Sequence, residues 1–268
     1  MLGVIVTGVA GRMGREIALC VSHEDGLRLV GGTEQKGHAA VGSDLFELLG
    51  LGKGGPPVND NLNNVIGHAD VVIDFTSPDS TLEHFNIAAD HGASFVTGTT
   101  GFSEEQLFII KNSRSGEIGY VMAPNMSVGV NVMFKLAAEA VKTLGAGYDI
   151  EITEIHHRHK KDAPSGTALR LAEICAQGCG RDIERVGVYG RHGFVGERKP
   201  EEIAVMSLRA GDAVGEHTVI FGGAGERLEI THRAGSRKNF AMGAIRAAKW
   251  IVKQKPGMYD MQDVLSIK

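Results

Sequence analysis

Few cysteines, few aromatic residues and little net charge limit what this chain of 268 residues can be. Its three cysteines, Cys20, Cys175 and Cys179, are odd in number and show no CxxC spacing, which argues against a disulfide framework or a zinc site and favours reduced thiols in the cytoplasm. The formal net charge is only −4 and aromatic residues make up 6%, so neither nucleic acid nor an anionic membrane is expected as a partner.

Long apolar runs are also missing. No stretch is long enough to span a membrane, and the chain begins on a strand-like run without the charged-then-apolar order of a signal peptide. Glycine, in contrast, is abundant at 37 residues, which is typical of tight turns and close backbone approaches. With 43% hydrophobic and 22% charged residues, the composition predicts a globular, cytoplasmic protein of one large or two smaller domains.

The first half of the chain alternates between short apolar runs and helical patterns. The strand candidates are residues 2–7, 27–33, 70–75, 93–96 and 120–123. Ser77-Pro78 offers an N-cap followed by proline at the first helical position, and Ser103 with Gln106 has the spacing of a capping box. Strands that alternate with helices predict an α/β fold in which a parallel sheet is covered on both faces.

The second half has a different pattern. A strand with one solvated face is expected from residue 148 onward, because apolar and polar residues alternate there. The strand candidates that follow are residues 203–209, 216–221 and 227–231. Gly211-Asp212 and Gly222-Gly223 are the turn signals between them. Strands so close together predict a central α+β domain with an antiparallel or mixed sheet.

We therefore divide the chain into two domains. A Rossmann-like dinucleotide-binding domain is predicted from residues 1–127 and 237–268, because an amphipathic helix at about 239–253 is expected to dock back on the first sheet. A substrate-binding and oligomerisation domain is predicted from residues 128–236.

A glycine-rich turn with the spacing GxxGxxG, Gly8 to Gly14, lies between the first strand and its helix. Glycines at such a place let backbone N–H groups approach a pyrophosphate at the positive end of the helix. Glu34 closes the next strand 20 residues past Gly14 (34 − 14), where an acid binds the ribose hydroxyls. An ordinary glycine turn beside a solvated glutamate is the alternative.

Two later loops, residues 98–101 and 123–127, also follow strands and are expected to face the nicotinamide, unless they are simple polar connections. The predicted cofactor-binding residues are Gly8, Val9, Ala10, Gly11, Arg12, Met13, Gly14, Glu34, Gln35, Gly98, Thr99, Thr100, Ala123, Pro124, Asn125 and Met126. Glu34 favours the free 2′-hydroxyl of NADH, and Gln35 stands where a 2′-phosphate calls for Arg, although Lys36 can supply a charge. NADH is expected to serve at least as well as NADPH.

The segment His156 to Lys161 concentrates three imidazoles and three cations in six residues. Mutual repulsion is expected to lower the pKa values of its histidines and lysines, which suits a proton-transfer group and an anionic substrate. A helix start follows at about Ser165, and the N–H groups of Gly166 and Thr167 can hold a carboxylate at its positive end. The combination predicts a substrate with two carboxylates.

Other interpretations of this segment are weaker. His156, His157 and His159 could bind a metal, but adjacent histidines point opposite ways on an extended chain and the neighbouring cations oppose a dication, so no metal is predicted. A solvated basic loop or an RNA-binding patch is disfavoured by the low aromatic content and the overall charge. A dehydrogenase of another small amino or keto acid and a non-enzymatic nucleotide sensor also stay open.

The run His156 to Ala168 resembles the signature of the 4-hydroxy-tetrahydrodipicolinate reductases, also called dihydrodipicolinate reductases, of bacterial lysine synthesis. The other matching segments are Gly8–Gly14, Glu34, Gly98-Thr99-Thr100, Ala123-Pro124-Asn125 and Ser236–Trp250. Gln35, where members that use NADPH often carry Arg, and Lys161, where a small apolar residue is more usual, are departures from the pattern.

The resemblance implies a function and residue roles. It implies an NAD(P)H-dependent reductase that dehydrates and then reduces a small cyclic dicarboxylate, 4-hydroxy-tetrahydrodipicolinate, to tetrahydrodipicolinate. It implies that His156 is the acid/base residue and that Lys160 donates a proton. It further implies that His157, Gly166 and Thr167 bind substrate, and that the enzyme is a homotetramer joined through the sheet of the second domain.

Overall fold

The computed structural model describes residues 1–112, 114 and 116–267. Contacts within the chain divide it into two compact units. Unit 1 comprises Met1–Ser127 and Arg237–Ser266, and unit 2 comprises Val128–Ser236. Within the described ranges, no helix has both the length and the apolar character needed to cross a lipid bilayer.

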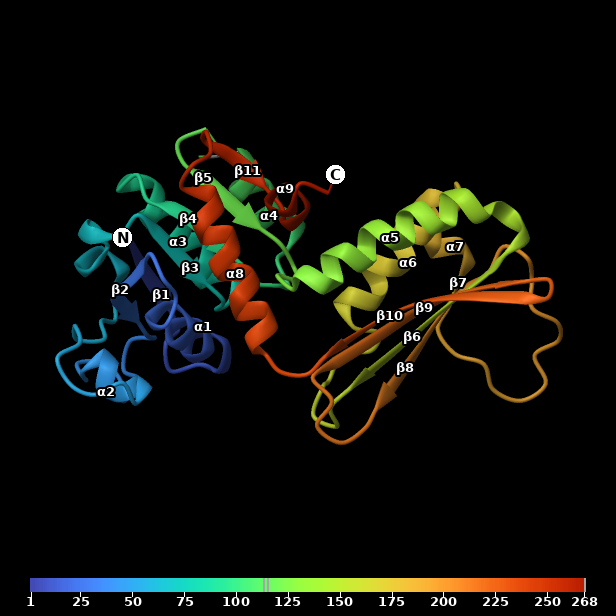
Figure 1. Cartoon of the computed structure of the whole chain (residues 1–268), viewed down its shortest axis with the longest axis horizontal. Coiled ribbons are helices and arrows are strands. Elements are labelled where there is room, and N and C mark those ends of the chain that lie inside the picture. Colours follow the sequence, from blue (N-terminus) through green and yellow to red (C-terminus); the bar gives the residue numbers. More distant parts are fainter. Residues whose placement is uncertain (113, 115, 268) are drawn as a thin grey trace. The chain divides into compact units, whose positions relative to one another are not determined.

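Unit 1 is built on a six-stranded parallel sheet with the order β11-β5-β4-β3-β1-β2 (Figure 1). Its strands are β1 (Leu2–Thr7), β2 (Leu27–Thr33), β3 (Val71–Asp74), β4 (Ser94–Thr97), β5 (Gly119–Met122) and β11 (Gly257–Tyr259). Its helices are α1 (Arg12–Ser22), α2 (Leu45–Leu49), α3 (Pro78–Asp90), α4 (Glu104–Asn112), α8 (Lys238–Ile251) and α9 (Met261–Leu265), with short 3₁₀ helices at Leu62–Asn64 and Ile66–His68. The strand order reverses between β1 and β3.

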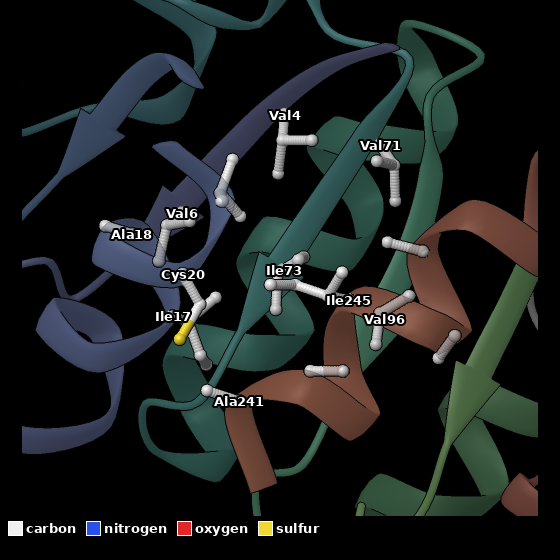
Figure 2. Packing of buried hydrophobic residues seen from close by; sticks show 14 of the residues in the cluster. Val4, Val6, Ile17, Ala18, Cys20, Val71, Ile73, Val96, Ala241 and Ile245 are labelled. Carbon is white, nitrogen blue, oxygen red and sulfur yellow. The ribbon is translucent and has the colours of Figure 1, made fainter. Parts of the chain in front are cut away.

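Each face of this sheet is buried under helices. Successive residues of β1 point to opposite faces, so Val4 and Val6 join one apolar cluster and Ile5 joins another. Figure 2 shows the first cluster, in which Val71 and Ile73 lie among side chains of α1 and α8. The second cluster includes α3 and α4. A fully buried Val or Ile side chain contributes about 1.5–3 kcal/mol, which explains why Val and Ile are frequent in the central strands.

The predicted α/β class and most of the expected elements of unit 1 are confirmed. α8 packs against α1, β3, β4 and β5, as its amphipathic pattern predicts. The capping box before α4 forms: the Ser103 hydroxyl accepts from the Gln106 amide, and the Ser103 amide donates to the Gln106 side chain. β11 and α9 escaped prediction because segments of three and five residues are too short to show periodicity.

Unit 2 contains a mixed five-stranded sheet with the order β10-β9-β6-β8-β7. Its strands are β6 (Asp149–His156), β7 (Gly187–Val188), β8 (Ile203–Arg209), β9 (Gly215–Gly223) and β10 (Glu226–Ala234). Its helices are α5 (Val128–Leu144), α6 (Gly166–Gly178) and α7 (Ile183–Val186), with a 3₁₀ turn at Gly145–Gly147. α5 and α6 lie on one face of the sheet (Figure 1). The predicted mixed sheet is confirmed.

The predicted turn at Gly222-Gly223 is wrong. Both glycines belong to β9, whose pairing continues to Gly223 opposite Glu226. The hairpin turns at residues 224–225 instead, where Gly225 has the positive φ of 82° that favours glycine. Gly223 has a different reason to be glycine, because a Cβ there would lie 2.6 Å from the ring of Tyr148.

Candidate active site

The glycine-rich turn of unit 1 is folded too tightly for side chains. Gly8 has a φ of +63°, and a Cβ on Gly14 would lie 2.0 Å from the Gly8 carbonyl oxygen. Gly11 is the N-cap of α1, so the turn lies at the positive end of that helix. These are the two properties that pyrophosphate binding requires of such a turn, close backbone approach and exposed positive dipole.

Glu34 lies beside this turn, directly after β2. Its carboxylate accepts hydrogen bonds from the Ala10 amide and the Gln35 amide, each at 2.9 Å. The acid is thereby held at the rim of the glycine turn although 24 residues separate it from Ala10 in sequence.

A cavity of about 590 Å³ lies within unit 1. Its lining includes Gly8, Gly11, Glu34, Gln35, Lys36 and His84. Phe75, Thr76 and Ser77, which follow β3, also line it, and Thr76 lies next to Gly8. The cavity therefore lies beyond the carboxyl ends of β1, β2 and β3, where the strand order reverses. Doubly wound sheets bind nucleotides at this point.

Several predicted cofactor-binding residues can contribute only their backbones. The side chains of Val9 and Met126 are fully buried in the core. The Thr99 hydroxyl donates to Asp74 at 3.0 Å, and Gly98 lies so close to Phe75 that a Cβ would be 2.2 Å from its ring. Ala123 is buried, and its amide donates to a carbonyl of β4. The more accessible predicted residues are Arg12, Met13, Thr100, Pro124 and Asn125.

The sequence analysis missed a buried carboxylate at the end of β3. Asp74 is 0% exposed and accepts hydrogen bonds from the hydroxyls of Thr7, Thr81 and Thr99 at 2.8, 2.7 and 3.0 Å, and from the Nδ1 of His84 at 2.6 Å. Burial by itself would raise the pKa of Asp74, but the hydrogen bonds from His84 and the threonines hold it below its usual value. An aspartate that ends an apolar strand was the available signal.

In unit 2, the end of β6 changes from apolar to charged on its buried face. Ile150 and Ile152 are followed on that face by Glu154 and His156, because alternate residues of a strand share a side. Glu154 is 0% exposed, and its Oε2 lies 2.5 Å from the Nδ1 of His156. Nη1 of Arg209, at the end of β8, lies 3.0 and 2.9 Å from the two carboxylate oxygens. Glu154 and Arg209 had no predicted role.

The pKa of His156 is lowered, in the predicted direction. Burial is the largest cause, and the charges of Lys160 and Arg209 add to it, whereas Glu154 acts in the opposite direction. For His156 the direction agrees with the prediction from clustered cations, although burial contributes more. A lowered pKa keeps the imidazole of His156 neutral at pH 7, ready to accept a proton.

The remaining predicted residues of this segment lie around the start of α6. Lys160 pairs with Asp162, with 2.9 Å between Nζ and Oδ1. Ser165 is the N-cap of α6, and Gly166 and Thr167 are its first two residues. His157 has a buried Nδ1 with no hydrogen-bond partner among the residues that the structure describes.

His217, on β9, is a further residue that the sequence analysis missed. It is 4% exposed, its Nε2 lies 3.0 Å from the Ser165 hydroxyl, and its ring meets that of His156 edge to face at 5.2 Å. Burial, reinforced by the charge of His156, lowers its pKa to about 3. His217 is therefore uncharged at neutral pH and lines this site. Across the described residues, no group of three or more His, Cys, Asp or Glu side chains is arranged to hold a metal.

A tight glycine turn at the switch point of a parallel sheet defines a dinucleotide-binding fold. A second unit with a buried histidine, a lysine and a helix N-terminus adds groups for proton transfer and anion binding. Together they define the class of the protein, an oxidoreductase that uses a nicotinamide cofactor.

Comparisons with known proteins are more specific. Residues 2–126 match the family model "Dihydrodipicolinate reductase, N-terminus", and residues 129–265 match "Dihydrodipicolinate reductase, C-terminus". The chain is 53% and 49% identical to the 4-hydroxy-tetrahydrodipicolinate reductases of Syntrophus aciditrophicus and Syntrophobacter fumaroxidans, each over 100% of both chains. The dipicolinate-bound dihydrodipicolinate reductase of Paenisporosarcina sp. TG-14 is similar in structure, with a TM-score of 0.73, 26% identity and 98% of each chain covered.

The chain therefore belongs to the dihydrodipicolinate reductase family, whose members are NAD(P)H-dependent oxidoreductases of diaminopimelate and lysine biosynthesis. The resemblance predicted from the sequence is confirmed, and so is the Rossmann-like class of the fold.

Proposed function

We propose that this enzyme converts 4-hydroxy-tetrahydrodipicolinate to tetrahydrodipicolinate with loss of water, using NADH or NADPH. The observation that carries the proposal is the composition of one end of unit 2. A buried histidine, His156, and a lysine, Lys160, lie in the segment that leads directly into the N-terminus of α6 at Gly166. Proton-transfer groups beside a helix N-terminus suit a dicarboxylate whose dehydration moves a proton and whose reduction adds one.

The residues of unit 1 fit a nicotinamide dinucleotide. The turn around Gly8 and Gly14 excludes any Cβ that would block a pyrophosphate, and the cavity of about 590 Å³ begins at that turn. Glu34 borders the same cavity and would bind the adenosine ribose. When bound, the reduced nicotinamide supplies a hydride. Unit 1 is thus proposed as the dinucleotide-binding domain and unit 2 as the substrate-binding domain.

The reaction adds one hydride and one proton overall, and unit 2 offers a neutral histidine and a lysine for the proton transfers. When the hydroxyl group leaves as water, its oxygen takes up a proton and the neighbouring ring carbon releases one. After the hydride has been added, the carbon next to the reduced position takes up a proton. We assign these transfers to His156 and Lys160. The side chain of Lys160 is 21% exposed, and Asp162 holds its Nζ. Gly166 and Thr167 would hold one substrate carboxylate at the α6 N-terminus, and His157 would bind the substrate through its ring.

We propose that NADH serves at least as well as NADPH. The Glu34 carboxylate lies at the cavity wall, where its charge repels a 2′-phosphate, and Gln35 offers no guanidinium to offset it. Lys36 lines the same cavity, and its positive charge would reduce the discrimination.

We also propose the homotetramer that the family resemblance implies, joined through the sheet of unit 2. The sheet face opposite α5 and α6 carries Ile155, Met206 and Ile220 as half-buried side chains and Leu208 at 46% exposure. Apolar side chains left partly exposed on a sheet face that also carries Glu151, Thr153 and Glu216 suit a mixed polar and apolar interface between subunits. Light scattering during size exclusion would give the mass of four chains, and the mass of one chain would refute the proposal.

The proposed reaction is tested by supplying the unstable substrate in place. The preceding synthase, with pyruvate and aspartate semialdehyde, generates it while the absorbance of NADH or NADPH is followed in parallel assays. Oxidation that requires both the synthase and this protein is the expected result. Binding of NADH without any substrate-dependent oxidation would leave the fold assignment intact and overturn the substrate. The ratio of the two rates tests the role of Gln35.

The three unpaired thiols agree with the cytoplasmic location expected from the composition.

A further inference from the structure

Glu154 is the most completely enclosed charged side chain near the proposed acid/base residue. Both of its oxygens are used: Oε2 accepts from Nδ1 of His156 at 2.5 Å, and Oε1 accepts from the Ser165 amide at 3.2 Å. Arg209 donates to both oxygens through Nη1, and its Nη2 donates to the Asp162 carbonyl. One carboxylate therefore joins β6, β8 and the start of α6.

The ionisation of Glu154 decides which nitrogen of His156 carries a proton. Burial alone would raise the pKa of Glu154, but hydrogen bonds from His156, Ser207 and Arg209 hold it below its usual value. An ionised carboxylate only accepts hydrogen bonds. Nδ1 of His156 must therefore be the protonated nitrogen, which leaves Nε2 as the nitrogen that can exchange a proton with a substrate.

We propose that Glu154 is the positioning residue for His156: it orients the ring, fixes the Nδ1-protonated tautomer, and couples that ring through Arg209 to the loop that contains Lys160. The proposal rests on the proposed acid/base role of His156. Glu154 does not touch substrate in this arrangement, because its carboxylate is fully buried and both oxygens are engaged.

A purely structural role is the competing explanation, since the Ser165 amide and the Arg209 guanidinium both need an acceptor. The two explanations differ in what they predict for proton transfer. A positioning residue changes the titration of His156, and its loss has no further effect once His156 itself is gone. A structural residue lowers the stability of the fold and acts independently of His156.

The substitution Glu154→Gln keeps the size of the side chain but replaces one acceptor oxygen by a donor. Either orientation of the amide places its NH₂ against a donor, the ring of His156 or the Ser165 amide. We expect kcat to fall on the order of 10²-fold, within the contribution typical of general acid–base catalysis, with an unchanged Kd for NADH. The matched control is Glu151→Gln, because Glu151 is held by two arginines on the opposite face of β6.

The pH profile gives a second readout. The charged or titratable groups that face His156 are Glu154 on β6, Lys160 in the following loop, Arg209 on β8 and His217 on β9. Of these four groups, only Glu154 raises the pKa of the ring. Its replacement by Gln should therefore move the limb due to His156 to lower pH, whereas the Glu151 control should leave that limb in place. A profile identical to that of the unsubstituted enzyme would overturn the proposal.

A double-mutant cycle separates this proposal from the one it rests on. If His156→Ala leaves kcat unchanged, the acid/base role of His156 fails. If His156→Ala lowers kcat but Glu154→Gln does not, the positioning role of Glu154 fails alone. The expected result is that Glu154→Gln has no further effect on kcat in the His156→Ala background. A loss as large there as in the unsubstituted enzyme indicates a structural role and contradicts the proposal.

A measurement on the unsubstituted enzyme covers the case in which Glu154→Gln fails to fold. Nitrogen NMR of protein labelled in its 11 histidines reports the tautomer of each ring, and the His156 signals are identified by their absence from the His156→Ala variant. Protonation at Nδ1 with an unprotonated Nε2 at neutral pH is expected. The opposite tautomer would show that Glu154 does not accept from this ring and would end the proposal.

Discussion

Each unit of this enzyme buries one carboxylate completely and pairs it with the Nδ1 of a histidine, but the two carboxylates are neutralised in different ways. Asp74 in unit 1 is surrounded by threonine hydroxyls, and its histidine, His84, lines the cavity of that unit. Glu154 in unit 2 is faced by the guanidinium of Arg209. Hydroxyls bring no charge of their own, whereas Arg209 brings a full positive charge that also lowers the pKa of His156.

The comparison indicates two different uses of a buried acid. In unit 1 the hydroxyl donors come from β1, from α3 and from the loops after β3 and β4, so Asp74 mainly holds backbone segments together around the cavity. In unit 2 the donors belong to groups that flank the proposed proton-transfer residue. Loss of Asp74 should therefore affect stability most, and loss of Glu154 should affect catalysis most.

The largest expected effect follows removal of the carboxylate of unit 1. Asp74→Ala leaves the hydroxyls of Thr7, Thr81 and Thr99 and the ring of His84 without their common acceptor. Leaving a buried hydrogen-bonding group without its partner costs roughly 1–3 kcal/mol for each group. Urea denaturation, followed by circular dichroism, should show that loss in the free energy of unfolding. An unchanged midpoint would mean that the hydroxyls find other partners and that Asp74 does not hold these segments.

Next in size is the effect of removing a proton donor from unit 2. Lys160→Ala should lower kcat about 10²-fold or more, since general acid catalysis typically contributes 10²–10⁴-fold. The Kd for NADH should not change, because the residue acts on the proton and not on the nucleotide. Lys161→Ala, which alters an exposed neighbour of the same charge, is the control. Weaker NADH binding in the Lys160 variant would contradict the assignment.

A moderate effect should appear in the acid stability of the enzyme. The folded-state pKa values of Asp74 and Glu154 are both below their usual values of 3.8 and 4.5, so each carboxylate contributes stability above those values. That contribution is lost as the pH falls through the lower, folded-state pKa. Asp74→Asn and Glu154→Gln should each flatten the decline in the free energy of unfolding below about pH 4.5. An equally steep decline in both variants would assign acid unfolding to other groups.

The smallest expected effect concerns how closely Gly215 packs against the ring of His156 in unit 2. A Cβ on Gly215 would lie 3.0 Å from Nε2 of His156, so Gly215→Ala should push the ring from its position. A rotamer displaced by about 30° costs roughly 0.5–1.5 kcal/mol, which corresponds to a loss in kcat of about 2- to 10-fold. Gly222→Ala on the same strand is the control, since the nearest atom to its Cβ would be 3.9 Å away. Equal kcat values for both variants would mean that the ring tolerates the displacement.

Patterns local to the sequence predicted most of the fold. Buried parallel strands such as residues 2–7 are continuous apolar runs, and helices such as α8 show their amphipathic period. The turn of β9 and β10 was misplaced because Gly222 and Gly223 look like turn residues, whereas only Gly225 has the turn conformation. The class of the fold did not depend on that detail.

Only part of the candidate site could be predicted from the sequence. The glycine turn and the segment His156 to Thr167 are continuous, so their residue types and spacing could be read directly. Arg209 and His217 reach the site from 55 and 52 residues away from their partners, Glu154 and Ser165. No local spacing relates them, because only the pairing of β8 and β9 with β6 brings them together.

The hydroxyls around Asp74 also have a kinetic consequence. Thr76 donates its amide to the Thr99 hydroxyl, which in turn donates to Asp74, so the loops after β3 and β4 cannot open one at a time without breaking a shared network. Their fluctuations should therefore be concerted, and the backbone amides of Thr76 and Thr99 should exchange their hydrogens with solvent at similar, slow rates. For a dinucleotide that enters this cavity, the loops after β3 and β4 would already be ordered. Binding would therefore lose little free energy to ordering them.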